Sequence, residues 1–263
     1  METINHLQSL PSSQVAAAVG ALSRADRERF LIAAQERLRR HGQREFYRLF
    51  PSKGAYRRQL YPRHMEFFAA GSDYRERCFL AANRVGKTVG GGYEISCHLT
   101  GLYPKWWPGR RFDRPTKCWS AGKTNETTRD IIQAKLLGSV QPRGSEKWMD
   151  GTGIIPGEML TKRPAWKSGV ADLVDTIKVK HVSGGYSTLG LKSYQQGRGS
   201  FEGTEQDVIW LDEECPEDVY GECLIRTATT DGLVMLTFTP LMGLTQVVLQ
   251  FLPDEMNPGA AAA

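Results

Sequence analysis

Residues 77–88, with the sequence Arg-Cys-Phe-Leu-Ala-Ala-Asn-Arg-Val-Gly-Lys-Thr, join a short apolar strand to a helix through a turn that ends in Gly-Lys-Thr. Such a turn predicts a phosphate-binding loop, because successive backbone N–H groups and the helix N-terminus form a positive cradle for phosphates. We expect Lys87 to reach the β- and γ-phosphates of ATP and the Thr88 hydroxyl to ligate Mg²⁺. Gly86 allows the backbone to approach the phosphates closely.

The same turn departs from the usual pattern, G-x-x-x-x-G-K-[ST], at its first position, where this chain has Ala81. The alternative to a phosphate site is a strand–turn–helix that matches the pattern by chance. On the phosphate-site interpretation, the nucleotide contacts come from the turn itself, namely from Asn83, Arg84, Val85, Gly86, Lys87 and Thr88.

An acidic cluster follows a second apolar strand, Val208–Leu211, in the order Asp212, Glu213 and Glu214. Open α/β sheets bind ligands at the carboxyl ends of their strands, and adjacent carboxylates there repel one another unless a cation is present. A P-loop ATPase also needs a carboxylate for the Mg²⁺ shell and a base for the attacking water. We expect Asp212 to bind Mg²⁺ and Glu213 to act as the general base, with Glu214 as the alternative base.

A third apolar strand, Leu233–Thr239, ends in hydroxyl groups and is followed by Pro240. In P-loop ATPases that use a catalytic glutamate, one strand lies between the P-loop strand and the acidic strand, so its polar end sits beside the γ-phosphate. At that position Thr237 or Thr239 would sense hydrolysis and, with Pro240, couple it to moving parts. The alternative is that Thr-Phe-Thr-Pro only makes a turn.

Strands and helices alternate along most of the chain, which is typical of a parallel sheet covered by helices on both faces. We therefore predict an α/β fold, a P-loop NTPase of the additional-strand, catalytic-glutamate type. It should have a mostly parallel central sheet flanked by helices and an N-terminal helical extension. The pattern predicts helices at 62–70, 87–99, 125–137 and after Pro216, strands at 77–82, 117–121, 177–182, 186–191, 207–212 and 233–239, and a long polar loop at 139–174.

The N-terminal part of the chain is polar and basic. Ser23-Arg24-Ala25-Asp26 predicts the capped start of a helix that reaches about Phe50, after a flexible or loosely helical arm. We expect three parts: an N-terminal arm and helical extension at 1–54, a P-loop ATPase domain at 55–256 and a tail at 257–263.

Composition argues against several other classes of protein. The five cysteines and five histidines are dispersed, so neither a disulfide framework nor a His/Cys metal site is expected. No apolar run reaches the ~20 residues of a membrane-spanning helix, and no secretory signal pattern is present. The formal charge of +5 divides into +6 for residues 1–80, +8 for 81–180 and −9 for 181–263. This asymmetry favours an enzyme that handles a polyanion over a surface whose charges are only solvated.

Two loops are candidates for contact with a nucleic-acid backbone, which a motor holds without base readout. Residues 139–170 carry several lysines and arginines, and residues 101–115 combine aromatic rings with cations, namely Trp106, Trp107, Arg110, Arg111 and Arg114. The alternative for the second of these loops is that its tryptophans pin it to the body of the protein.

Five blocks occur in an order that resembles the large subunits of phage terminases: FLAANRVGKT, LTGLYPKWWPGRRFDRP, KSYQQGRGSFEGT, VIWLDEE and TFTPLMGLT. The resemblance covers roughly residues 55–252. It implies an ATPase motor that threads viral double-stranded DNA into a procapsid through its portal. It also implies a terminase small subunit as partner, a homo-oligomeric ring as the active form, and a place in the cytoplasm of the infected bacterial host without membrane contact. Family members carry a C-terminal nuclease domain, which we expect to be absent here, together with DNA cleavage.

The resemblance also assigns roles to single residues. Lys87 and Thr88 match the Walker A lysine and hydroxyl. Asp212 matches the Walker B aspartate, and Glu213 the catalytic glutamate. Thr239, with the proline that follows it, resembles the coupling motif.

Further roles are implied outside these motifs. Arg84 resembles the arginine that terminases place within the P-loop. Tyr61 and His64 lie in a stretch that resembles the adenine-binding segment, where related ATPases often have Gln and where Tyr61 would stack on the base. Arg198, in a Gly-rich loop before the acidic strand, is expected to contact phosphates, in cis or across a subunit boundary; the alternative is a structural arginine.

Two other functions stay open at this stage. One is a different P-loop nucleic-acid translocase, although a helicase-like enzyme normally has a second ATP-binding lobe. The other is a non-hydrolysing DNA- or capsid-binding module with a degenerate P-loop, which Ala81 favours.

Overall fold

The computed structural model describes residues 19–32, 44–161 and 163–252. The chain divides into two compact units, Met1–Arg48 and Leu49–Ala263, each of which is described by itself.

In the first unit, residues 24–32 are helical and the short helix α4 spans Glu45–Arg48. The Ser23 hydroxyl accepts a hydrogen bond from the Asp26 N–H at 3.1 Å, so the predicted capped helix start is confirmed. Most of the predicted arm, and the part of the predicted helix at 33–43, lie outside the described residues.

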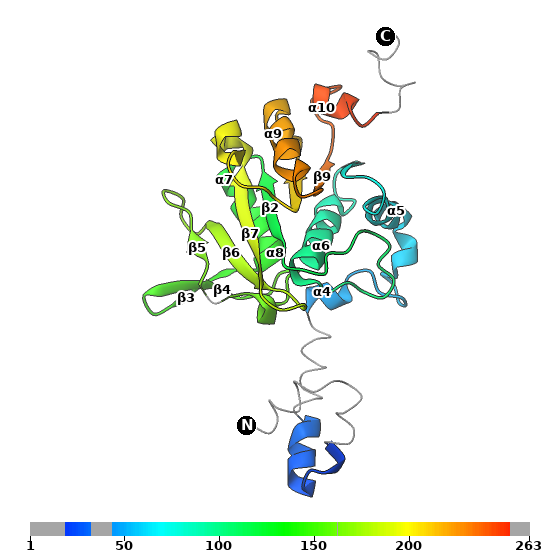
Figure 1. The fold of residues 1–263 in the computed structure, drawn as a ribbon, viewed down its shortest axis with the longest axis vertical. Coiled ribbons are helices and arrows are strands. Elements are labelled where there is room, and N and C mark those ends of the chain that lie inside the picture. The colour runs from blue at the N-terminus through cyan, green and yellow to red at the C-terminus, as the bar shows by residue number, and fades with distance from the viewer. Residues whose placement is uncertain (1–18, 33–43, 162, 253–263) are drawn as a thin grey trace. The chain divides into compact units, whose positions relative to one another are not determined.

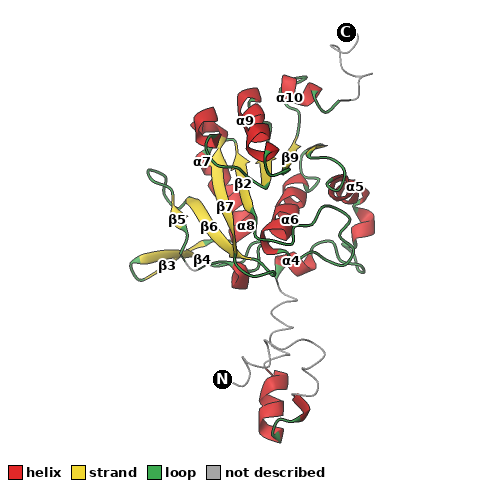
Figure 2. Ribbon diagram, viewed as in Figure 1, coloured by secondary structure: helices red, strands yellow, loops and turns green. Residues whose placement is uncertain are grey.

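The second unit is built on a seven-stranded sheet (Figures 1 and 2). The order across the sheet is β1 (Glu76–Leu80), β9 (Leu233–Phe238), β8 (Val208–Asp212), β2 (Lys117–Gly122), β7 (Tyr186–Ser193), β6 (Val174–Lys180) and β5 (Ala165–Trp166). The first five of these strands run parallel, β6 is antiparallel to β7, and β5 is antiparallel to β6. The predicted α/β class with a mostly parallel sheet is confirmed.

The position of β9 decides the geometry of the site. β9 lies between β1 and β8, with Phe79 opposite Thr237 and Thr237 opposite Asp212. This is the inserted strand that the sequence predicted. Because the three strands are parallel, their carboxyl ends meet at one edge of the sheet.

Helices cover both faces of the parallel part of the sheet (Figure 2). On one face lie α6 (Lys87–Thr100) and the helix formed by α7 (Asn125–Thr127), the π-turn η2 (Thr128–Gln133) and α8 (Ala134–Leu137). On the other face, α9 (Glu217–Ala228) packs its buried residues against Ile209 and Leu211 of β8. With helices on both sides, every residue of β8 is buried. Smaller helices complete the unit: η1 (Arg58–Leu60), α5 (Pro62–Ala70), η4 (Tyr194–Gln196), η5 (Arg198–Phe201) and α10 (Gln246–Leu249).

The prediction of a long polar loop at 139–174 is wrong. This segment contains the hairpin β3 (Val140–Arg143) and β4 (Glu146–Met149), the turn η3 (Gly157–Met159) and the edge strand β5. β4 is largely exposed and lacks the alternation of buried and exposed residues that marks a strand in sequence. The residues of β4 are extended because they pair with β3, and a local sequence pattern does not reveal such pairing.

No helix among the described residues is long and apolar enough to cross a membrane.

We expect Gly91→Ala to destabilise the fold. A Cβ at Gly91 would lie 2.4 Å from Nε1 of Trp210, so α6 would have to move away from β8. Overpacking of this kind costs about 1–3 kcal/mol, which urea denaturation would measure. Gly221→Ala is the matched control, because nothing lies within 4 Å of a Cβ there and alanine favours a helix. An equal effect of the two substitutions would contradict the close approach.

Candidate nucleotide-binding site

The P-loop leaves β1 and reaches α6 through two residues in the left-handed conformation, Arg84 (φ 64°) and Gly86 (φ 88°). Ala81, where the usual pattern has glycine, does not have a positive φ, and its N–H extends the pairing with β9 by donating to Phe238 O. A side chain is therefore compatible with the backbone at this position. Arg84, Val85 and Asn83 are exposed on the turn.

Lys87 closes the turn and joins it to β9. Its Nζ donates to Ala82 O at 2.6 Å and to the Thr239 hydroxyl at 2.8 Å, and the side chain is largely buried. The Thr239 hydroxyl oxygen also lies 2.8 Å from Ala81 O and 2.8 Å from Asn83 Oδ1. The P-loop lysine and the predicted coupling threonine are thus in direct contact. Pro240 follows at the exposed surface.

Asp212 is held by hydroxyl groups from two neighbouring elements. The Thr88 hydroxyl lies 3.1 Å from both carboxylate oxygens, and the Thr237 hydroxyl donates to Oδ1 at 2.6 Å. Trp210 Nε1 donates to Thr237 at 2.8 Å, which orients the threonine. Burial raises the pKa of Asp212 to about 6; the neighbouring Glu213 also raises it, whereas Thr237, Thr88 and Lys87 lower it.

The donor set around Asp212 fits Mg²⁺. A hydroxyl and a carboxylate are hard oxygen ligands, and Mg²⁺ in phosphate sites keeps few protein ligands because substrate phosphates and water supply the others. Among the described residues no group of three or more His, Cys, Asp and Glu side chains could hold a metal ion. Thr88 and Asp212 supply one hydroxyl and one carboxylate, which suits an ion whose other ligands come from a nucleotide and water.

The two glutamates after β8 differ in environment. Glu213 has a left-handed backbone conformation (φ 68°) and an exposed side chain. Two hydrogen bonds hold this backbone: the Glu213 N–H donates to Thr237 O, and the Tyr194 hydroxyl donates to Glu213 O. Non-glycine residues in this conformation are often found at functional sites. Glu214 instead accepts a hydrogen bond from the Thr245 hydroxyl at 2.5 Å. Glu213, and not Glu214, has a carboxylate free for solvent at this edge.

His64 lies under the P-loop. It is buried on α5, its Nε2 is 3.2 Å from Gly86 O, and its ring contacts Phe79 of β1 edge to face. Burial lowers its pKa, which the bond to Gly86 partly offsets. Tyr61 is half-buried against His64. His64 thus packs directly against the turn, and Tyr61 packs against His64, so the structure gives both residues a packing role beside the expected contact with adenine.

Arg198 lies apart from these groups, on η5. Its side chain pairs with Glu222 of α9 at 3.1 Å and is about half exposed. No contact between Arg198 and the P-loop, Asp212 or Glu213 is present among the described residues.

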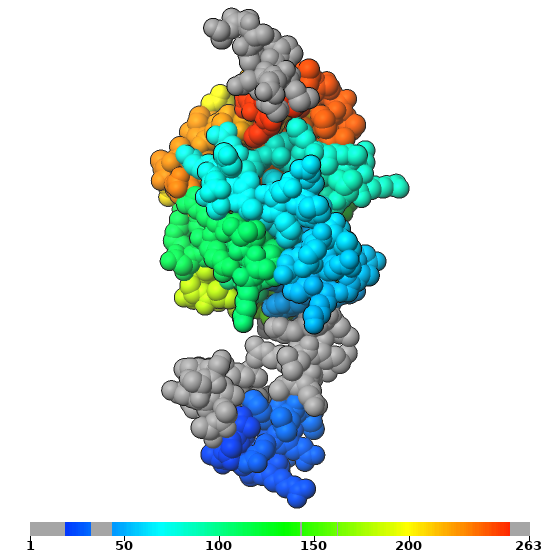
Figure 3. Space-filling view, turned by 90° about the vertical axis from the view of Figure 1, so that its right-hand side faces the viewer, coloured from blue at the N-terminus to red at the C-terminus, as the bar shows by residue number. Residues whose placement is uncertain are grey.

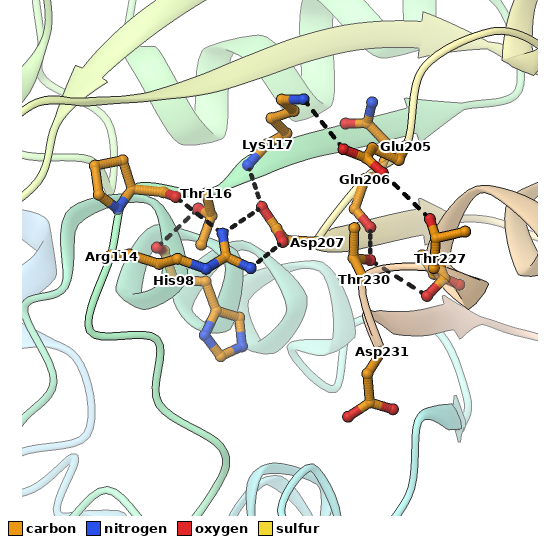
Figure 4. A network of polar contacts seen from close by, with 12 residues as sticks. His98, Arg114, Thr116, Lys117, Glu205, Gln206, Asp207, Thr227, Thr230 and Asp231 are labelled. Atoms are coloured by element: carbon orange, nitrogen blue, oxygen red, sulfur yellow. Dashed lines mark hydrogen bonds and ion pairs between the residues drawn. The ribbon is translucent and has the colours of Figure 1, made fainter.

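The aromatic and basic loop at 101–115 is pinned by its own side chains. Trp107 is buried, and its Nε1 donates to Arg110 O at 3.0 Å. Arg110 reaches Asp231 at 3.2 Å. Arg114 forms two hydrogen bonds with Asp207, which also accepts from the Lys117 N–H (Figure 4). These cations stabilise the edge of the sheet opposite to the P-loop.

A buried ion pair lies behind the P-loop, and no sequence pattern indicated it. Arg77 of β1 donates to Glu94 of α6 at 2.8 Å, and His98 lies 3.3 Å from the same carboxylate. Burial alone would raise the pKa of Glu94, but the Arg77 guanidinium and His98 hold it below its usual value. A glutamate inside a helix carries no signal that it will be buried, so only the fold reveals this pair.

Two sequence comparisons relate the chain to known proteins. Residues 78–262 match the family described as "Terminase large subunit, T4likevirus-type, N-terminal". The chain is 40% identical over 213 residues to the "Terminase, large subunit" of Salmonella phage P22, a match that covers 74% of this chain and 41% of that protein. The chain thus spans about two fifths of the length of this curated relative.

Solved structures give weaker matches. A variant of the large terminase ATPase domain of Thermus phage P74-26 has a TM-score of 0.41 and 17% identity, over 68% of this chain and 64% of that one. The large terminase of bacteriophage HK97 has a TM-score of 0.44 and 13% identity, over 68% of this chain and 32% of that one.

Proposed function

Because this chain belongs to the family of terminase large subunits, we propose that it is the ATP-hydrolysing motor part of a genome-packaging enzyme. It would couple hydrolysis to the movement of double-stranded DNA into a procapsid. The observation that carries the proposal is the convergence of two hydrogen-bonded pairs at the carboxyl edge of the sheet, Lys87 with Thr239 and Thr88 with Asp212, in which Lys87 and Thr88 are adjacent residues at the start of α6.

The proposed roles follow from these contacts. Lys87 exchanges its bonds to Ala82 and Thr239 for the β- and γ-phosphates, while the turn residues donate backbone N–H groups. Thr88 and Asp212 hold Mg²⁺, which neutralises charge on the phosphate oxygens when bound.

Glu213 takes the proton of the attacking water, because its carboxylate is exposed beside Asp212 and its backbone is held rigidly. Arg84 lies on the P-loop and acts on the phosphates in cis. Arg198 pairs with Glu222 of α9, apart from the P-loop. If Arg198 contacts phosphates, we therefore expect them to belong to a nucleotide that is bound by a neighbouring subunit.

Coupling passes through Lys87 and Thr239. Loss of the γ-phosphate returns the Lys87 ammonium to the Thr239 hydroxyl and so reports hydrolysis to the end of β9 and to Pro240. Thr237 instead holds Asp212, so it is a positioning residue for the metal ligand.

We place the active protein in a homo-oligomeric ring at the portal of the procapsid, in the cytoplasm of the infected bacterium, with a terminase small subunit as a further partner. The expected division into 1–54, 55–256 and 257–263 stays a proposal.

ATP turnover tests the proposed function. We expect Lys87→Ala to lower turnover about 100-fold or more, because one charged donor to the transferred phosphate is lost. Lys178→Ala, which removes an exposed lysine on β6, is the control and should keep full turnover. Turnover is measured against protein concentration and with added procapsids, so that a site shared between subunits is also detected. Wild-type turnover no higher than that of Lys87→Ala under all of these conditions would favour a non-hydrolysing binding module.

A further inference from the structure

Two segments that lie far apart in the chain, 49–65 and 101–112, contain cations and no Asp or Glu. The fold brings them together. The Arg58 guanidinium lies over the Trp106 ring at 5.3 Å, and the rings of Phe50 and Trp106 are in edge contact with 6.3 Å between centroids. Figure 3 looks onto the side of the second unit that carries the sky-blue 49–65 segment. Two basic stretches thus become one surface.

Not all cations of these segments are available to a partner. Arg63 pairs with Glu66, and Arg110 pairs with Asp231. The others form no ion pair with any described residue, and we call them the basic surface: Lys53, Arg57, Arg58, Lys105 and Arg111.

The hydrogen bonds of the basic surface leave its charges uncompensated. Arg57 donates to Gly54 O at 3.4 Å, and Arg111 donates to Pro104 O at 3.2 Å, both neutral acceptors. Lys53 and Lys105 extend into solvent. Since unpaired exposed cations attract anions, this surface is suited to a polyanion.

The neighbouring side chains favour a nucleic acid over a protein as that polyanion. The cores of protein–protein interfaces are depleted of charged residues, whereas protein–DNA interfaces are rich in positive charge. Here five cations have no carboxylate partner among the described residues, and Tyr56, which is 73% exposed, adds a hydroxyl that can donate to a phosphate oxygen.

We propose that the basic surface binds the phosphate backbone of double-stranded DNA. The inference rests on the proposed function in taking DNA as the polyanion that the motor handles. In place of the whole loop at 101–115, the proposed site combines two segments. Trp107, Arg110 and Arg114 of the loop are structural. Three of the five cations, Lys53, Arg57 and Arg58, come from the 49–65 segment.

The test measures binding of a short DNA duplex by fluorescence anisotropy over a range of salt concentrations, without nucleotide. The variant Lys53→Gln/Lys105→Gln removes two exposed charges, and neither lysine side chain makes a hydrogen bond with a described residue. Each lost phosphate contact lowers the affinity for DNA at 0.1 M salt by up to about eightfold. It also lowers the slope of log affinity against log salt concentration by about 0.9 in magnitude. We expect affinity to fall by up to about 60-fold and the slope of log affinity against log salt concentration to fall by up to about 1.8.

The matched control is Lys178→Gln/Lys180→Gln, which removes the same charge from exposed positions on β6. It should bind DNA as the wild type does. An equal loss in both variants, no loss in the first, or no binding by the wild type at low salt would each overturn the proposal. A change of oligomeric state with unchanged DNA binding would identify a second copy of the chain as the occupant instead.

Because no ATP is present, this result is independent of hydrolysis. A protein that binds DNA through the basic surface but turns over no ATP would refute the proposed function and leave the inference standing.

Discussion

Glu213→Gln is expected to lower the rate of ATP hydrolysis by about 10²–10⁴-fold, the usual contribution of a positioned general base. Nucleotide binding should persist, because the Glu213 side chain is exposed and the P-loop contacts of Lys87 and Thr88 do not involve it. Turnover under saturating ATP and the affinity for a fluorescent ATP analogue measure the two effects separately.

Glu214→Gln is the control for this assignment. Its carboxylate is bonded to Thr245, so the substitution should reduce stability more than turnover. Normal hydrolysis by Glu213→Gln, with a large loss in Glu214→Gln, would transfer the role of base to Glu214.

Asp212→Asn is expected to stabilise the protein without ligand at pH 8 while abolishing Mg²⁺-dependent turnover. The Asp212 side chain is 4% exposed, and burial raises its pKa to about 6 from 3.8. Between pH 3.8 and about 6, the Asp212 carboxyl is therefore protonated in the folded state and ionised in the unfolded state. For this reason the free energy of unfolding falls as pH rises from about 4 to about 6. Above pH 6 the full penalty is present, and its removal should raise the free energy of unfolding by about 1–3 kcal/mol.

The pH dependence provides the control. Well below pH 3.8 the carboxyl is protonated in both states, so the wild type and Asp212→Asn should unfold with similar midpoints. A constant difference between the two proteins at all pH values would show that the charge of Asp212 is not the cause. Undiminished hydrolysis by Asp212→Asn would remove this residue from the metal site.

These two predictions describe one compromise. A carboxylate buried among Thr88, Thr237 and the indole of Trp210 is costly when no metal ion is bound, because Lys87 offsets only part of the burial. The same burial holds Thr88 and Asp212 in place and shields them from water when a nucleotide is bound. Stability lost in the free protein is thus linked to affinity for a Mg²⁺–nucleotide.

The features that depend on local pattern and on parallel topology could be predicted from the amino-acid sequence. A Gly-Lys-Thr turn at the junction of strand and helix needs only a few residues to define a phosphate cradle. The apolar runs before Asp212 and Thr239 predicted strands, and parallel strands must bring their carboxyl ends to one edge. For that reason the meeting of Lys87 with Thr239, and of Thr88 with Asp212, could be anticipated.

The surroundings of individual side chains, in contrast, become known only from the folded chain. Glu213 and Glu214 are identical in sequence terms, and the bond from Thr245 distinguishes them. Likewise Arg110 and Arg111 are neighbours, yet only Arg110 meets a carboxylate, that of the distant Asp231. Burial and partners arise from residues far apart in the chain, so no local pattern encodes them, and they set both the charge state of each group and its freedom to act.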